Sequence, residues 1–124
     1  MASKITIISD DQKLIEHIKT TALTLTKLNK TIFITDISVK NLTKPENDIP
    51  INTKYVLIDL DDNFNLIIDY IKKIRNTSSH CSVKIISFFS ESSPPDKKAV
   101  FNSGCDAVFS KEELIAVVQN LLQY

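Results

Sequence analysis

The stretch KYVLIDLDD, residues 54–62, decides the fold expected for this chain. Its first part is a nearly continuous apolar run, which is typical of a strand that helices cover on both faces of a parallel sheet. The run closes at Asp59, and Asp61 and Asp62 follow directly after it. In an open parallel sheet, reacting groups gather beyond the carboxyl ends of the strands, so this edge is the place to look for chemistry.

Four further segments rich in β-branched residues surround this strand, and segments of helical period alternate with them. This alternation indicates βαβ units around one parallel sheet. The predicted strands are Lys4–Ser9, Thr31–Ile37, Lys54–Asp59, Val83–Phe88 and Asp106–Phe109.

Three amphipathic helices are predicted from apolar stripes, over Asp11–Lys27, over Asn63–Arg75 and from Lys111 onward. Another helix should follow the fourth strand, with Ser92 or Ser93 as its cap and Pro94 and Pro95 in its first turn. It should end at Gly104, the only glycine, where a left-handed cap is usually needed. Residues 38–53 contain two prolines and show no clear period, so the helix between the second and third strands should be short or irregular.

Length and charge narrow the class of protein. A chain of 124 residues is expected to form one domain spanning residues 1–124. Fifteen basic and fifteen acidic residues cancel, which argues against direct binding to nucleic acid. The apolar stretch near the N-terminus is too short for a signal peptide or a membrane span, so we expect a cytoplasmic protein. Cys81 and Cys105 are expected to be reduced, structural thiols.

Polar residues close several of the predicted strands. Asp10 or Asp11 follows the first strand, Asp59 closes the third, Ser87 lies in the fourth and Lys111 follows the fifth. Neighbouring carboxylates repel one another, and a hard divalent cation such as Mg²⁺ is the usual remedy. With an ammonium group and a hydroxyl nearby, such an edge could cradle an anion at a carboxylate that accepts a phosphoryl group.

Five stretches of the chain carry a family resemblance that covers essentially its whole length. They are IISDD (7–11), YVLIDL (55–60), IIDYIKKIRN (67–76), VKIIS (83–87) and AVFNSGCDAVFSKEEL (99–114). Together they resemble the receiver domains of response regulators in two-component systems, including single-domain, chemotaxis-type receivers. The resemblance implies a flavodoxin-like (βα)5 doubly wound parallel sheet with strand order 2-1-3-4-5.

The resemblance also implies a role for each residue at the sheet edge. Asp59 would be the phosphoacceptor, Asp10 a metal-binding carboxylate, and Asp61 would offer its backbone carbonyl to Mg²⁺. Ser87 would be the hydroxyl that moves toward the phosphoryl group, and Lys111 its counter-cation.

The same resemblance implies the partners and the limits of the activity. A sensor histidine kinase or phosphotransfer protein would act upstream, and an effector protein or output domain downstream. No enzyme activity is expected beyond self-phosphorylation and autodephosphorylation, and no membrane contact. A homodimer through the last helix and fifth strand is a further expectation from the family.

Two registers of the acidic pair are open, Ser9–Asp10 and Asp10–Asp11. The first fits the apolar run better; it replaces one of the family's two carboxylates and leaves Asp11 as the following acidic residue of the pocket. Val108 also stands where the family has a switch aromatic. These departures support an alternative function, a degenerate pseudo-receiver that binds partners without phosphorylation.

A flavin-binding enzyme of the same topology is a third class. It is disfavoured because Asp10 and Asp11 would repel a phosphate group after the first strand. A single glycine also rules out the glycine-rich loops that bind nucleotides.

Overall fold

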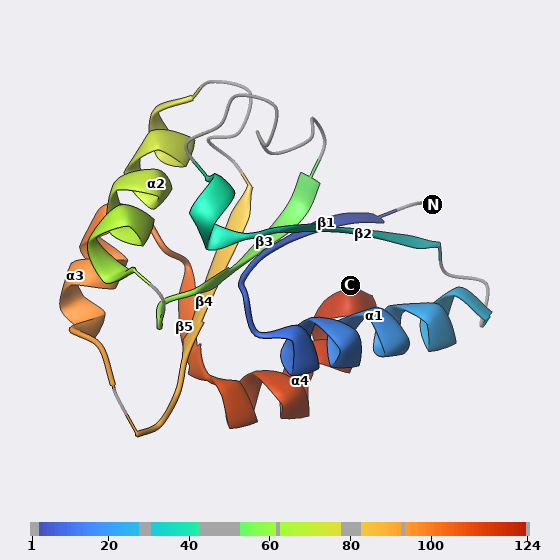
Figure 1. The fold of residues 1–124 in the computed structure, drawn as a ribbon. Coiled ribbons are helices and arrows are strands. Elements are labelled where there is room, and N and C mark those ends of the chain that lie inside the picture. Colours follow the sequence, from blue (N-terminus) through green and yellow to red (C-terminus); the bar gives the residue numbers. More distant parts are fainter. Residues whose placement is uncertain are drawn as a thin grey trace.

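A five-stranded parallel sheet forms the centre of the protein (Figure 1). The computed structural model describes residues 3–27, 31–42, 53–61, 63–77, 83–92 and 94–123. The strands lie in the order β2-β1-β3-β4-β5, and every neighbouring pair is parallel, which confirms the predicted strand order. Their bounds are β1 Ser3–Ile8, β2 Ile32–Ile37, β3 Thr53–Asp59, β4 Lys84–Phe89 and β5 Ala107–Ser110.

Helices cover both faces of this sheet, as the predicted doubly wound fold requires. Figure 1 shows α1 and α4 on one face and α2 and α3 on the other. Because parallel strands need crossover connections, α1, α2 and α3 each return the chain to the end of the sheet where the next strand begins. The bounds are α1 Gln12–Lys27, the short 3₁₀ helix η1 Val39–Asn41, α2 Phe64–Asn76, α3 Lys97–Ser103 and α4 Lys111–Gln123.

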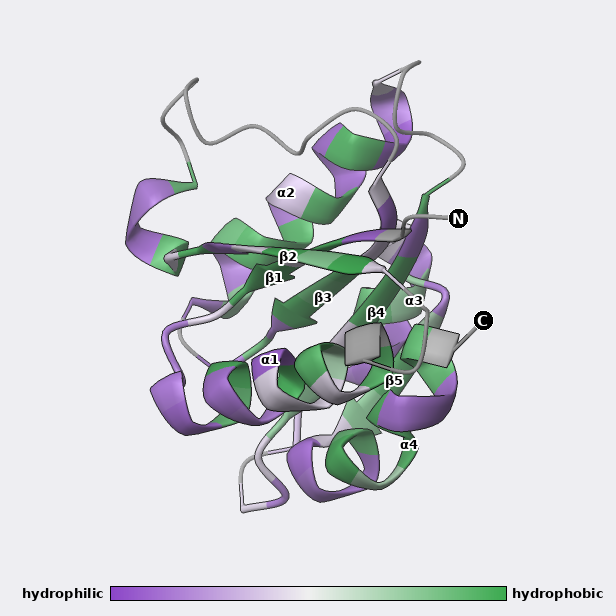
Figure 2. Cartoon of the chain, turned by 90° about the vertical axis from the view of Figure 1, so that its right-hand side faces the viewer, coloured by the Kyte–Doolittle hydropathy of each residue, from purple (hydrophilic) through white to green (hydrophobic). Residues whose placement is uncertain are grey.

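Two apolar clusters fill the layers on either side of the sheet. Leu57 of β3 and Phe88 of β4 point toward α1 and α4, whereas Ile58 and Ile85 point toward α2 and α3. This alternation follows from the two-residue period of a strand. Figure 2 shows the result, with apolar strands inside and the polar stripes of the helices outside. The face on which a side chain lies is therefore set by its position in the strand.

The start of α3 differs from the prediction. Asp96 caps the helix by accepting a hydrogen bond from the Ala99 N–H at 3.2 Å, so neither Ser92 nor Ser93 is the cap. Ser93 itself lies outside the described residues. The prolines at 94 and 95 precede this cap rather than lying in the first turn. The predicted end is confirmed, because Gly104 adopts a left-handed conformation with φ of 118°.

Arg75 at the end of α2 ties three neighbouring segments together. Its guanidinium donates hydrogen bonds to the Gly104 carbonyl at 2.7 Å, the Val83 carbonyl at 2.6 Å and the Asp106 carboxylate at 2.6 Å. A Cβ atom at position 104 would lie 2.5 Å from Arg75 Cγ. Glycine is therefore required here for two reasons, its backbone conformation and the close approach of Arg75.

The remaining expectations about the fold concern short segments. In the described part of the connection from β2 to β3, residues 38–42, the structure has the one-turn helix η1. The rest of the segment predicted to hold a short or irregular helix, residues 43–52, lies outside the described residues. Cys105 is a buried free thiol, as predicted, whereas Cys81 and Asp62 lie outside the described residues. None of the helices in the described ranges is both long and apolar enough to cross a membrane.

Candidate functional site

Asp59 is the last residue of β3 and lies at the carboxyl end of the central strand. It is only 1% exposed. In register with Phe88, it points toward the face covered by α1 and α4. One carboxylate oxygen accepts a hydrogen bond from the Ser9 hydroxyl at 2.7 Å, and the other accepts from the Asp61 N–H at 2.9 Å. A carboxylate is therefore held rigidly where two central strands end.

Opposing effects act on the pKa of the Asp59 carboxyl. Burial raises the pKa of its carboxyl, while hydrogen bonds from the Asp61 N–H and the Ser9 hydroxyl and the charge of Lys111 act to lower it. Burial prevails, so the pKa lies above its ordinary value. A perturbed carboxyl with a nearby cation at the edge of a sheet is a candidate reactive group.

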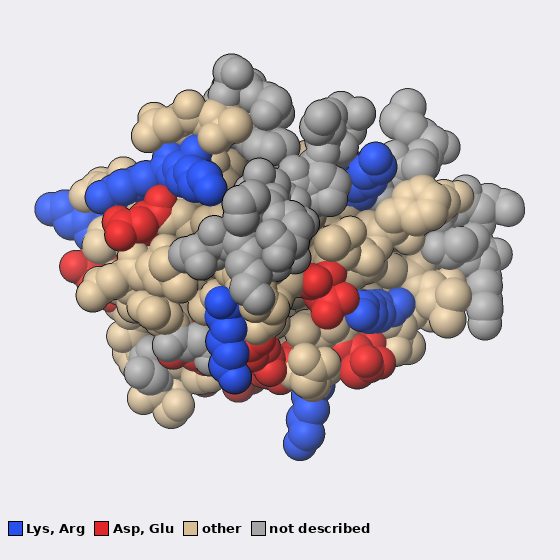
Figure 3. All heavy atoms as spheres, turned by 45° about the horizontal axis from the view of Figure 1, so that its top comes forward, with Lys and Arg blue, Asp and Glu red and all other residues tan. Residues whose placement is uncertain are grey.

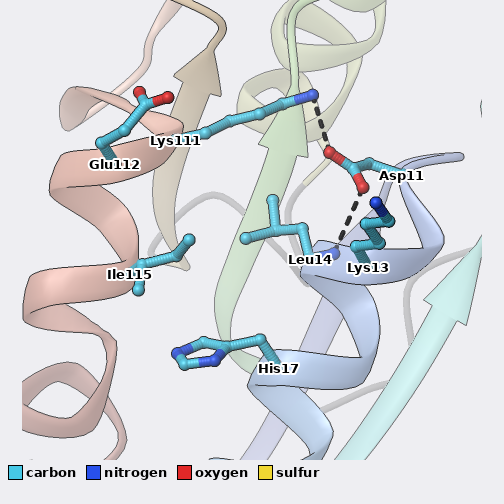
Figure 4. Close-up of a pocket in the computed structure, with 7 residues that line it drawn as sticks. All are labelled: Asp11, Lys13, Leu14, His17, Lys111, Glu112 and Ile115. Carbon is cyan, nitrogen blue, oxygen red and sulfur yellow. Dashed lines mark hydrogen bonds and ion pairs between the residues drawn. The ribbon is translucent and has the colours of Figure 1, made fainter.

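Lys111 supplies the cation of the site. Its ammonium nitrogen lies 3.0 Å from an oxygen of Asp11, 3.0 Å from one of Asp61 and 3.5 Å from one of Asp59. Figure 4 shows the side chain reaching from the start of α4 across to Asp11 at the start of α1. Burial opposes its charge, but the surrounding carboxylates outweigh burial and raise the pKa of Lys111 well above its ordinary value. Lys111 is thus charged and joins three acidic groups from two segments, the start of α1 and the end of β3.

The backbone around Lys111 is fixed by a reciprocal cap. The Ser110 hydroxyl accepts from the Glu113 N–H at 3.1 Å, and the Glu113 carboxylate accepts from the Ser110 N–H at 3.0 Å. Such a capping box holds the first turn of a helix in place. It sets Lys111 as the first residue of α4, next to the end of β5.

The first loop contributes Asp11 to the cluster rather than Asp10. Asp11 caps α1 by accepting from the Leu14 N–H at 3.2 Å, and its N–H donates to the Ser9 hydroxyl at 3.0 Å. Burial acts to raise its pKa, but hydrogen bonds from Lys111 and the Leu14 N–H outweigh it and lower the pKa. Asp10 is half-buried, and none of the described residues forms a hydrogen bond or ion pair with its carboxylate. The metal-binding role expected for Asp10 therefore stays a prediction.

Asp61 joins the site through its side chain. The Ser90 hydroxyl donates to one of its oxygens at 2.6 Å, and the Ser90 N–H lies 3.1 and 3.2 Å from the two oxygens. Burial acts to raise the pKa of Asp61, but these donors and Lys111 lower it below its ordinary value. The prediction considered only the backbone carbonyl of Asp61, and nothing in the structure tests that role.

The structure corrects the expected position of Ser87. Ser87 is fully buried, pairs in register with Ile58 on the face of α2 and α3, and lies 3.1 Å from the Cys105 sulfur. Asp59 pairs with Phe88 and points to the opposite face, so the pleat separates the two side chains. Ser90, for which the sequence predicted no role, supplies the hydroxyl of this cluster instead. The sequence contained a signal of this difference, because Ser87 matches the spacing of receiver domains only if about two extra residues lie between it and Gly104.

A divalent cation does not fit the site as it is folded. The oxygen donors are of the kind that Mg²⁺ prefers. However, the Lys111 ammonium already lies among these oxygens. In the Ser9–Asp10 register, one of the two acidic positions is also a serine and supplies no carboxylate. In the described ranges, no three His, Cys, Asp or Glu side chains are arranged to hold a metal ion. A divalent ion would have to displace Lys111 from the carboxylates.

A shallow pocket adjoins the cluster between α1 and α4 (Figure 4). Leu14 and Ile115 form its apolar part, and Asp11, Lys111 and His17 lie at its sides. On the face seen in Figure 3, acidic and basic side chains are interspersed among the described residues. The face seen in Figure 3 therefore shows no patch of a single sign of charge among the described residues.

Comparison with known proteins defines the fold. No family model matches the sequence. No curated protein matches it either. Solved structures do match across nearly the whole chain. A signal receiver domain of a two-component histidine kinase from Clostridium thermocellum has a TM-score of 0.75 at 12% identity, covering 98% of each chain.

Two further structures agree with this match. The Francisella response regulator 1452 receiver domain has a TM-score of 0.65 at 22% identity, covering 98% of this chain and 97% of its own. The Mn²⁺-bound form of response regulator Rcp1 has a TM-score of 0.68 at 12% identity, covering 98% and 93%. The chain therefore has the receiver-domain fold.

Proposed function

We propose that this chain is a phosphoaccepting receiver domain of a two-component phosphorelay. Asp59 would take a phosphoryl group from a sensor histidine kinase or phosphotransfer protein and would thereby regulate an effector protein or output domain. The supporting observation is the placement of the Asp59 carboxylate at the end of the central strand, with the Lys111 ammonium 3.5 Å away. The receiver-domain fold of the solved neighbours supports the same function.

The residues supply chemistry suited to this transfer. A carboxylate oxygen of Asp59 attacks the phosphorus in line, a P–O bond forms, and the P–N bond of a phosphohistidine donor breaks. The bonding electrons leave with the histidine nitrogen. Lys111 offsets negative charge as it develops, and the Asp61 N–H holds the carboxylate in position. Beyond this transfer and the later hydrolysis of the acyl phosphate, we propose no enzymatic reaction.

Incubation with acetyl phosphate tests the proposal. Intact mass should increase by one phosphoryl group in the wild-type chain and not in Asp59→Asn. Asp36→Asn is the matched control, because Asp36 is an exposed carboxylate on the outermost strand β2, where it pairs with Lys19. Parallel reactions with Mg²⁺ and with a chelator would show whether the transfer needs a divalent ion. A gain of mass that survives Asp59→Asn would contradict the proposal, as would the absence of any gain.

Two serine variants examine the hydroxyl of the site. Ser90→Ala should slow the gain of the phosphoryl group, because the hydroxyl of Ser90 belongs to the cluster around Asp61. Ser87→Ala removes a hydroxyl on the other face of the sheet and should leave the rate unchanged. The opposite order of effects would support Ser87 as the phosphate-contacting hydroxyl.

A second function, that of a pseudo-receiver, is favoured by the burial of Asp59 and by the lysine that already pairs with its carboxylate. Such a module would bind its partner whether or not Asp59 can be phosphorylated. Equal affinity of wild-type and Asp59→Asn chains for a partner, together with no phosphoryl gain, would select this function. A difference in affinity after phosphorylation would select the first.

A further inference from the structure

A phosphoryl group on Asp59 would need hydrogen-bond donors. It would bring close to two negative charges and three strong acceptor oxygens to the end of β3. The Ser9 hydroxyl and the Asp61 N–H already donate to the Asp59 carboxylate. Among the described residues, the other donors of this cluster are the Lys111 ammonium and the hydroxyl and N–H of Ser90. The first comes from α4 and the other two from the end of β4.

The Asp61 carboxylate engages all three of these donors. It lies 3.0 Å from the Lys111 nitrogen and 2.6 Å from the Ser90 hydroxyl, and its oxygens accept from the Ser90 N–H at 3.1 and 3.2 Å. Asp61 is also tethered from the other side, because its own N–H donates to Asp59. Contacts with Lys111 of α4, with Ser90 after β4 and with Asp59 of β3 therefore fix the position of Asp61.

We infer that Asp61 is a positioning residue whose carboxylate acts as an internal anion, occupying the donors that a phosphoryl group on Asp59 would use. The inference rests on the proposed function and concerns regulation of the same site. Its first consequence is that the lysine and serine are already drawn together before any phosphoryl group arrives. Its second is that an incoming anion must displace Asp61 and also meets its negative charge. Asp61 therefore sets how readily the site accepts an anion.

Inorganic phosphate tests this without any phosphoryl transfer. It is titrated, with no metal added, into Asp59→Asn protein with and without Asp61→Ala, and the Ser90 amide is followed by ¹H–¹⁵N NMR. The Asp59→Asn background removes the charge of the acceptor itself. Freeing a charge-assisted hydrogen bond should tighten phosphate binding by about tenfold or more, with Ser90 among the most shifted amides. Equal affinities, or a Ser90 amide that does not move, would overturn the inference.

A conservative variant separates occupation of the donors from simple repulsion. Asp61→Asn removes the charge but keeps an oxygen that can accept from Ser90. Its affinity should therefore fall between that of the protein retaining Asp61 and that of the Asp61→Ala protein. If the Asn and Ala variants bind phosphate equally well, repulsion alone explains the effect and the inference fails. Asp36→Ala in the same background is the control, because it removes an exposed carboxylate that pairs with Lys19 on β2, outside the cluster, and should leave the affinity unchanged.

Acetyl phosphate then separates this inference from the proposed function. With Asp59 restored, Asp61→Ala should gain the phosphoryl group faster than the wild type, again by about tenfold or more. If neither chain gains it while the phosphate titration behaves as expected, the proposed function fails and the inference stands. If both gain it at the same rate, the proposed function stands and the inference is overturned.

Discussion

Replacing Lys111 with methionine should destabilise the protein in a strongly pH-dependent way. Methionine keeps the length and apolar stem of the side chain but removes the charge that joins Asp11, Asp59 and Asp61. At a separation of about 4 Å and an effective dielectric constant of about 20, one such pair is worth about 4 kcal/mol before desolvation. The contributions do not add, because the partly exposed Asp11 and Asp61 side chains can be solvated once the lysine is gone.

Protonation limits the cost of leaving Asp59 without its cation. Asp59 has a side chain only 2% exposed, so it will take up a proton instead of staying charged. From the ordinary pKa of 3.8, neutralising it costs about 4 kcal/mol at pH 7 and about 1.6 kcal/mol at pH 5. In the variant, the pKa of Asp59 in the folded state rises. Stability is therefore lost as the pH rises above the pKa of Asp59 in the unfolded chain, and it is recovered as the pH falls. We expect a loss of about 2–4 kcal/mol at pH 7 and no more than about 1.6 kcal/mol at pH 5.

Urea unfolding followed by circular dichroism at both pH values measures this difference. Lys19→Met is the matched control, since Lys19 pairs with Asp36 at 2.9 Å but both side chains are exposed, by 40% and 41%. Its cost should stay below about 1 kcal/mol at either pH. A loss below about 1 kcal/mol for Lys111→Met at pH 7, or a loss equal at the two pH values, would refute the account of a lysine that neutralises a buried carboxylate.

Three further substitutions probe the frame that holds the site, each by urea unfolding. Arg75→Leu should cost about 2–4 kcal/mol, because the carbonyls of Val83 and Gly104 and the Asp106 carboxylate lose a shared donor; a neutral result would show that water replaces it. Gly104→Ala should cost more than about 1 kcal/mol, given its φ of 118° and the contact with Arg75, and a stabilised variant would contradict that reading. Ser110→Ala should cost about 1 kcal/mol through the lost helix cap, and no change would mean that the cap is replaceable.

Local patterns predicted the elements well because each depends on neighbouring residues. The apolar stripes of α1, α2 and α4 and the β-branched runs of the strands are properties of segments of about ten residues. The start of α3 was misplaced for a similarly local reason, since two prolines suggested a first turn while Asp96, slightly further on, had the side chain that caps the helix. Boundaries of this kind depend on which of several competing caps is used.

The residues of the site show where sequence reasoning ends. That Asp59 closes a buried central strand follows from the run YVLID, and that Lys111 lies near it follows from the parallel order of the strands. The sequence did not show that Ser87 lies on the face away from Asp59 while Ser90 lies in the cluster. The pleat of β4 decides this, because neighbouring positions of a strand point to opposite faces.

By itself, the sequence determined that this chain alternates strands and helices and that carboxylates collect where the strands end. Only the tertiary structure decided which oxygen contacts which donor. Asp11 and Lys111 are a hundred residues apart, yet their side chains meet at 3.0 Å. Periodicity reports the face of an element, whereas a hydrogen bond depends on how two separate elements are packed against the sheet. The cluster around Asp61 exists because α1, α4 and the ends of β3 and β4 are held together by the two apolar layers.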